Sequence, residues 1–164
     1  MSLATGPRTA LWSATGWDDP RVAALRAAMD AELHPRYAPP GGGARPRPPG
    51  PAADEVLLTW LALVDGEPAA TASLRRLAHP GEPVRHEVKR VYVHPGHRRH
   101  GLAAAALARV EGSARAAGLD RLLLQTGALQ PEAIALYRRE GWTPVDPYPP
   151  YDALPHSRCF AKRL

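Results

Sequence analysis

The sequence predicts an α/β (α+β) fold in which helices flank a mixed, mostly antiparallel central sheet. The length of 164 residues suits one domain, so we expect residues 1–164 to fold as a single unit. Hydrophobic residues make up 45% of the chain and charged residues 23%, which is typical of globular proteins. Segments with helical and strand periodicity follow in the order α-β-β-β-α-β-α-β-β, and this order indicates a mixed sheet.

The first clear element is a helix, because residues 1–17 show no regular period. Asp19 and Pro20 have the character of an N-cap and a first-turn proline. The helix is predicted to run to about Leu33, since apolar residues then recur at helical spacing, at Val22, Leu25, Met29 and Leu33.

Residues 38–53 contain six prolines and four glycines and no foldable pattern. The chain before this segment is too short to fold alone. We therefore predict a flexible Pro/Gly-rich loop within the domain rather than a boundary between domains.

Three strand-like runs come next, at 55–64, 68–77 and 86–93. Asp65-Gly66 between the first two is a hairpin turn signal, so these runs are predicted to form an antiparallel meander.

The second half alternates helices and strands. A helix is predicted from Gly101 to Gly118, with Leu102, Ala106, Val110, Ala114 and Ala117 on one face. A strand over 121–126, a helix from about 130 or 131 to 140, and strands over 142–145 and 156–164 complete the order. Residues 146–155 are expected to form a loop.

Composition excludes several classes of protein. With Cys159 as its one cysteine, the chain cannot form an intrachain disulfide. Residues 1–20 lack the pattern of a secretion signal, and the longest apolar stretch, 56–64, is far shorter than the roughly 20 residues of a membrane helix. We therefore expect a cytoplasmic protein that does not bind membranes. The net charge of +5 favours an anionic partner, either nucleic acid or a phosphate-bearing ligand.

The most informative segment is Val91-Tyr-Val-His-Pro-Gly-His-Arg-Arg-His-Gly-Leu-Ala103, where a strand leads through a basic turn into a helix. A helix N-terminus offers unpaired N–H groups and the positive end of the helix dipole, so it binds anions. Gly101 lets the backbone approach a phosphate closely. A pyrophosphate would fit this turn.

Other phosphate motifs are disfavoured. Gly96 and Gly101 have the Walker A spacing, but Leu102 and Ala103 follow where Lys and Ser/Thr are needed. The dinucleotide fingerprint is absent. A nucleic-acid role lacks a helix-turn-helix, zinc or aromatic-platform motif, and we expect no metal, because His94, His97 and His100 flank a proline across a turn.

The sequence resembles the GNAT superfamily of acyl-CoA-dependent N-acyltransferases. Arg98-Arg99-His100-Gly101-Leu102-Ala103 matches the family signature Arg/Gln-x-x-Gly-x-Gly/Ala at every fixed position. A second similar block is Leu124-Gln-Thr-Gly127 followed by Gln130-Pro-Glu-Ala-Ile-Ala-Leu-Tyr-Arg-Arg-Glu-Gly-Trp142. The resemblance covers about residues 55–145 and implies a single GNAT-like domain that uses acetyl-CoA as co-substrate.

The resemblance also implies which residues bind the cofactor. Backbone amides of the signature turn would hold the pyrophosphate, and main-chain groups of the preceding strand would hold the pantetheine arm. Many members carry an asparagine shortly before the tyrosine of the second block, where this chain has Gln130. The implied cofactor residues are Val91, Val93, Arg98, Arg99, His100, Gly101, Leu102, Ala103, Ala104 and Gln130.

Two residues are predicted to catalyse transfer. Some family members place a glutamate where this chain has Glu87, and such a group could take the amine proton directly or through a water. The alternative is a surface residue paired with Lys89 or Arg90. Tyr137 matches the tyrosine that the family often places near the thioester sulfur, where it would protonate the thiolate; the alternative is an aromatic at the edge of the core.

The expected reaction is transfer of an acetyl group to a primary amine in a ternary complex, with a small-molecule or peptide acceptor. Tyr37, Tyr148 and Tyr151 lie in or near the loops that would flank the acceptor, with His156 beside them. The alternative is a non-catalytic acyl-CoA-binding module of the same fold. Dimerisation is common in the family, which leaves a homodimer open, and Cys159 is expected to be a buried thiol without a nucleophilic role.

Overall fold

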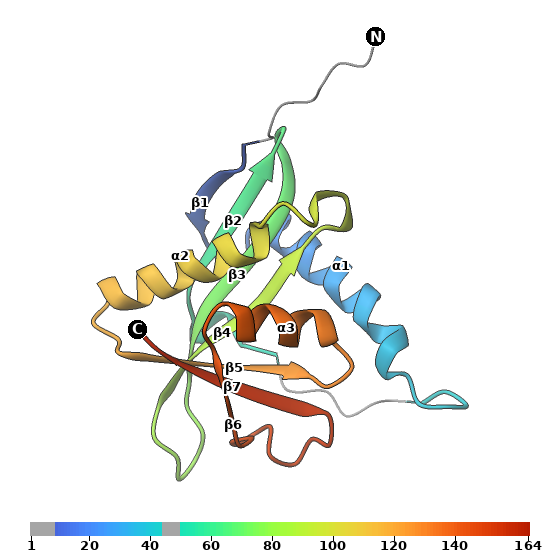
Figure 1. Cartoon of the computed structure of the whole chain (residues 1–164), viewed down its shortest axis with the longest axis vertical. Coiled ribbons are helices and arrows are strands. Elements are labelled where there is room, and N and C mark those ends of the chain that lie inside the picture. Colours follow the sequence, from blue (N-terminus) through green and yellow to red (C-terminus); the bar gives the residue numbers. More distant parts are fainter. Residues whose placement is uncertain (1–8, 44–49) are drawn as a thin grey trace.

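The computed structural model describes residues 9–43 and 50–164 and contains a seven-stranded sheet with the order β1-β2-β3-β4-β5-β7-β6 (Figure 1). The β4–β5 pair is parallel and the other pairs are antiparallel. This arrangement confirms the predicted mixed, mostly antiparallel sheet flanked by helices.

The first strand, β1 (Leu11–Thr15), is an element that the sequence did not predict. It pairs with β2 (Val56–Val64) at the edge of the sheet, and its exposure pattern lacks the alternation of buried and exposed residues that marks a half-buried strand. In the described residues the element order therefore starts with a strand, not with a helix.

Helix α1 (Pro20–Tyr37) begins as predicted. The Asp19 carboxylate accepts from the backbone N–H of Arg21, and Pro20 occupies the first turn. The helix ends four residues later than predicted, because Pro35 removes only one backbone hydrogen bond in the last turn. Contacts of Arg36 and Tyr37 with α3 also hold this end in place.

The meander is confirmed. The hairpin between β2 and β3 (Glu67–Leu77) turns at Asp65 and Gly66, whose φ values of 54° and 84° suit a tight primed turn. Strand β4 (Arg85–Val93) pairs with β3. In the predicted loop 38–53, residues 44–49 lie outside the described part, and 53–55 form a short helix, η1 (Ala53–Glu55).

The second half follows the predicted order. A short helix, η2 (Pro95–His97), leads into α2 (Leu102–Ala116), followed by β5 (Arg121–Gly127) and α3 (Pro131–Arg139). Strands β6 (Thr143–Val145) and β7 (Ser157–Arg163) enclose the predicted loop. Ala117 is the exposed C-cap of α2 and does not join the buried face.

Helices cover both faces of the sheet (Figure 1). On one face, α2 and α3 pack on a core that includes Val88, Leu124 and Phe160. On the other face, α1 packs against Leu61 and Tyr92, while the 146–156 loop covers Leu123 and Cys159. These two layers place different side chains on the two sides of β4.

Candidate active site

The central feature is a gap between β4 and β5. In the described chain these strands pair only at Glu87 with Leu123 and Val88 with Leu124. Beyond Val88 the backbone of β4 therefore has no strand partner on that side, and a cavity opens there.

A β-bulge in β4 lies beside this gap. Arg90 has a φ of 57°, and the register with β3 shifts between Thr71 and Ser73. Val88 and Val91, three residues apart, both pack toward α2, which the strict alternation of a regular strand would not allow. The bulge thus interrupts β4 just beyond Val88, the last residue that pairs with β5.

Two adjoining cavities occupy the gap, one of about 640 Å³ and one of about 300 Å³. The larger contains side chains from both faces of the sheet, including Lys89 and Tyr137. The smaller lies against the signature turn and the start of α2. Both are lined by Met29, Leu33, Val91, Gln130, Ala133 and Tyr137, so the two cavities adjoin, and together they are called the channel.

The smaller cavity has the features of an anion site. Gly101 is the N-cap of α2 with a φ of 75°, and the first backbone N–H groups of the helix have no intrahelical acceptor. The cavity contains nine of the ten predicted cofactor residues, all except His100, which is exposed in the same turn. Those nine are Val91, Val93, Arg98, Arg99, Gly101, Leu102, Ala103, Ala104 and Gln130.

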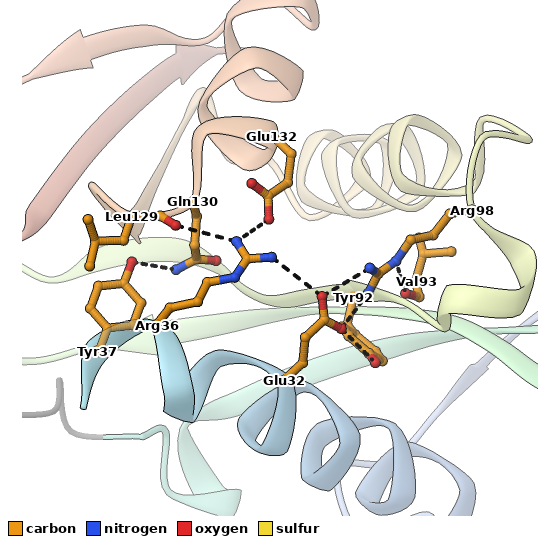
Figure 2. Close-up of polar contacts among 9 residues, drawn as sticks. All are labelled: Glu32, Arg36, Tyr37, Tyr92, Val93, Arg98, Leu129, Gln130 and Glu132. Atoms are coloured by element: carbon orange, nitrogen blue, oxygen red, sulfur yellow. Dashed lines mark hydrogen bonds and ion pairs between the residues drawn. The ribbon is translucent and has the colours of Figure 1, made fainter. Parts of the chain in front are cut away.

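The Arg98 side chain is held by two partners, Glu32 and Val93 (Figure 2). Its guanidinium donates two hydrogen bonds to the Glu32 carboxylate, at 2.9 and 2.6 Å, and its Nε donates to the Val93 carbonyl at 3.0 Å. The Arg98 hydrogen bonds lower the pKa of Glu32 below its usual range. Glu32 of α1 therefore already neutralises part of the positive charge that was expected to face the cofactor.

The end of α1 also contacts α3 across the channel (Figure 2). Arg36 donates to the Leu129 carbonyl and to the Glu132 carboxylate, and Gln130 donates to the Tyr37 hydroxyl at 3.2 Å. Gly127 permits this approach, because a Cβ there would lie 1.8 Å from the Tyr37 hydroxyl oxygen. Tyr37, a predicted acceptor residue, thus lines the larger cavity.

Tyr137 lies on α3 between the two cavities. Its ring packs against Trp142 and Phe160, and burial raises the pKa of its hydroxyl well above the usual value. Within the described residues this hydroxyl has no hydrogen-bond partner, so it can donate to a group in the channel.

Glu87 lies behind the larger cavity rather than on its wall. It is fully buried, accepts from Arg75 Nε at 2.9 Å, and receives the Tyr148 and Tyr151 hydroxyls at 2.6 and 3.0 Å. It therefore does not occupy the surface position that was the alternative interpretation. Tyr148 and Tyr151, which were expected beside the acceptor, are instead buried against this carboxylate.

Lys89 connects the buried group around Glu87 to the larger cavity. Its ammonium donates to the Tyr151 hydroxyl at 3.2 Å, and its side chain lines the larger cavity. Neither Lys89 nor Arg75 was predicted from the sequence as a functional residue. The available signals were the two-residue spacing from Glu87 to Lys89, which places both on one strand face, and the pairing of Arg75 opposite Glu87.

Among the described residues, no group of three or more His, Cys, Asp and Glu side chains is arranged to hold a metal ion. Within the same residues, none of the helices combines the length and apolarity required to traverse a bilayer. Cys159 is buried in β7 as expected, and burial raises the pKa of its thiol to about 11.

The point where β4 parts from β5 lies beside the turn, Arg98 to Ala103, whose sequence resembles the GNAT signature. Residues 25–142 match the acetyltransferase (GNAT) family. The chain belongs to this family.

Individual proteins similar to this chain are also named as acetyltransferases or acyl-CoA N-acyltransferases. An IAA acetyltransferase of Azospirillum brasilense is 45% identical over 78 residues, and this alignment spans 48% of the chain and about half, 51%, of the relative. A Klebsiella pneumoniae structure assigned as an acyl-CoA N-acyltransferase is 29% identical, with a TM-score of 0.74 over 94% of this chain and 97% of that one. A GNAT acetyltransferase of Elizabethkingia anophelis with acetyl-CoA bound shares the fold at 16% identity, with a TM-score of 0.65 over 94% and 98% of the two chains.

Proposed function

We propose that the protein transfers an acetyl group from acetyl-CoA to a primary amine of a small molecule or peptide, by direct attack within a ternary complex. The observation that carries this proposal is the channel through the gap between β4 and β5. It runs from the free amides of α2 to a cavity lined from both faces of the sheet, so the two substrates can meet inside the protein.

The smaller cavity is the proposed cofactor site. The amides of Gly101 to Ala104 would bind the pyrophosphate, with Arg98 and Arg99 supplying positive charge beside it and His100 offering a ring N–H from the same turn. The unpaired backbone of β4 at Val91 and Val93 would bind the pantetheine arm, and Gln130 would contact the cofactor from α3.

Tyr137 is the proposed acid. Its raised pKa keeps the hydroxyl protonated across the physiological range, so it can donate to the departing thiolate. Direct transfer is favoured over a covalent intermediate, because the one cysteine of the chain is buried and its thiol pKa is raised.

Glu87 is proposed to assist removal of the amine proton from behind the cavity. Since its carboxylate is fully buried, it would act through Tyr151 and Lys89, which link it to the cavity wall. The acceptor itself would lie against Tyr37, with Tyr148 and Tyr151 holding Glu87 in place.

The test is an assay of free thiol release from acetyl-CoA across a panel of amines and peptides, with mass spectrometry of the products. An acetylated amine formed in proportion to the released thiol supports the proposal. If acetyl-CoA binds and no amine is acetylated, the chain is instead an acyl-CoA-binding module of the same fold.

A further inference from the structure

Lys89 is a buried ammonium that the chain leaves only partly satisfied. The residue is 8% exposed, and its single side-chain hydrogen bond within the described residues is to the Tyr151 hydroxyl. In that part of the chain no carboxylate lies within ion-pair distance of Nζ, whereas the nearby Arg75 is paired with both Glu87 and Glu55. An ammonium has three N–H donors, so two remain for a group in the cavity.

The sheet separates Lys89 from Tyr137. Lys89 extends toward Tyr151, on the face covered by α1 and the 146–156 loop. Tyr137 belongs to the core beneath α2 and α3, on the opposite face. Because both line the same cavity, they meet across the gap between β4 and β5. An amine entering from the Lys89 face would thus meet a thioester whose sulfur lies toward Tyr137.

Apart from the Tyr137 hydroxyl, the other ionisable groups on the cavity wall are engaged or exposed. Arg36 is paired with Glu132, and Arg90 is paired with Asp30 at 2.6 Å. His156 is exposed and packs edge-on against Tyr37. On the sheet face covered by α1 and the 146–156 loop, Lys89 is therefore the buried ionisable group of the cavity wall that has no charged partner among the described residues.

We propose that Lys89, in its neutral form, is the group that removes the proton from the acceptor amine. This inference rests on the proposed acetyl transfer and assigns its base. As the amine nitrogen bonds to the acetyl carbon, its proton passes to Lys89 Nζ. The carbon–sulfur bond breaks, and the thiolate takes a proton from Tyr137. Proton exchange with water through the cavity then restores both side chains.

The surroundings of Lys89 suit this role. Burial lowers its pKa to about 8, although Glu87 acts in the opposite direction. Arg75 on β3 and Arg90 on β4 also lower it, while Cys159 on β7 raises it. The Tyr148 and Tyr151 hydroxyls remain protonated because burial and Glu87 raise their pKa values. A base with a pKa near the working pH is the most effective, and Glu87 stabilises the ammonium that forms.

The test compares Lys89→Met with Lys89→Arg. Methionine removes the base while keeping the shape of the side chain, and arginine keeps the charge but cannot release a proton. We expect both variants to lower kcat by about 10²–10⁴-fold, with unchanged calorimetric affinity for acetyl-CoA. The rise of kcat with pH around 8 should disappear in both. Lys162→Arg, the same change at the chain's other lysine, should leave kcat unchanged.

Recovery of kcat in Lys89→Arg would overturn the proposal, because the charge alone would then suffice to anchor the acceptor. Wild-type kcat in Lys89→Met would also overturn it. A readout independent of turnover is NMR titration of the side-chain nitrogens, which has only two lysines to resolve. A Lys89 pKa at the ordinary value of 10.5 refutes the base, whereas the absence of any acetylated amine with wild-type protein refutes the proposed function.

Discussion

The hydroxyl of Tyr137 carries the clearest single-residue prediction. If it donates to the thiolate, Tyr137→Phe should lower kcat by about 10²-fold or more while the affinity for acetyl-CoA stays the same. The variant should fold, because the ring contacts with Trp142 and Phe160 do not involve the hydroxyl. Steady-state kinetics combined with calorimetry separates these effects, and an unchanged kcat would remove Tyr137 from the reaction.

Lys89 also predicts how stability depends on pH. Its pKa is about 8 in the folded chain and 10.5 as the ordinary value, so below pH 8 the fold bears the cost of a buried ammonium. Between about pH 8 and 10.5 the unfolded chain binds more protons, and this cost is relieved as pH rises. Lys89→Met should therefore be more stable than wild type at pH 7, with a difference that narrows toward pH 10.5 in urea titrations. A constant difference would contradict this assignment.

Some residues of the candidate site could be predicted from the sequence and others could not. The signature from Arg98 to Ala103 is contiguous, so its place at a helix start was predictable. Arg99 has a φ of 65°, a left-handed backbone conformation that glycine adopts more easily than arginine does. The burial of Glu87 was not predictable, because it depends on Arg75, Tyr148 and Tyr151, which come from two distant segments.

Among the elements, the start of α2 is the one on which the proposed cofactor binding depends. Gly101→Val should abolish binding of CoA, since a φ of 75° is strained for a β-branched residue and the strain would displace the helix amides. Gly112 provides the matched control in the same helix, because a Cβ there meets no atom within 4 Å. Gly112→Ala should keep CoA binding and stabilise the fold by about 0.5–1 kcal/mol.

Calorimetry with CoA and thermal unfolding measure both effects. If Gly101→Val binds CoA as well as wild type does, the helix amides are not the pyrophosphate site. A loss of binding in Gly112→Ala would instead show that binding responds to any change in α2.

Elements with strong local patterns were predicted well. The period of α2 and the Asp65-Gly66 turn are local features, and both appear where expected. Strand β1 was missed because it forms by pairing with a distant strand, β2, and its own residues lack alternation. The end of α1 was misplaced because its last turn depends on contacts between Arg36 and α3.

At the scale of the molecule, the sheet consists of two parts joined by a short parallel contact. Strands β1–β4 and strands β5–β7 meet through two residue pairs, and the channel separates them further along. A ligand that fills the channel would contact both parts and bind only the folded state.

Acetyl-CoA should therefore stabilise the whole fold. At a free concentration 100 times its Kd, linkage predicts about 2.7 kcal/mol of added stability and a higher Tm. Hydrogen exchange should slow at the facing edges, at 89–93 in β4 and 125–127 in β5. Protection confined to α2 would indicate that the cofactor does not enter the gap.

The central claim is that this channel binds acetyl-CoA, and calorimetric titration tests it most directly. We predict saturable binding of acetyl-CoA and of free CoA at a single site. ATP should not bind detectably, because it lacks the pantetheine arm that fills the gap between β4 and β5. Failure of a folded sample to bind acetyl-CoA, or equal binding of ATP, would contradict the account.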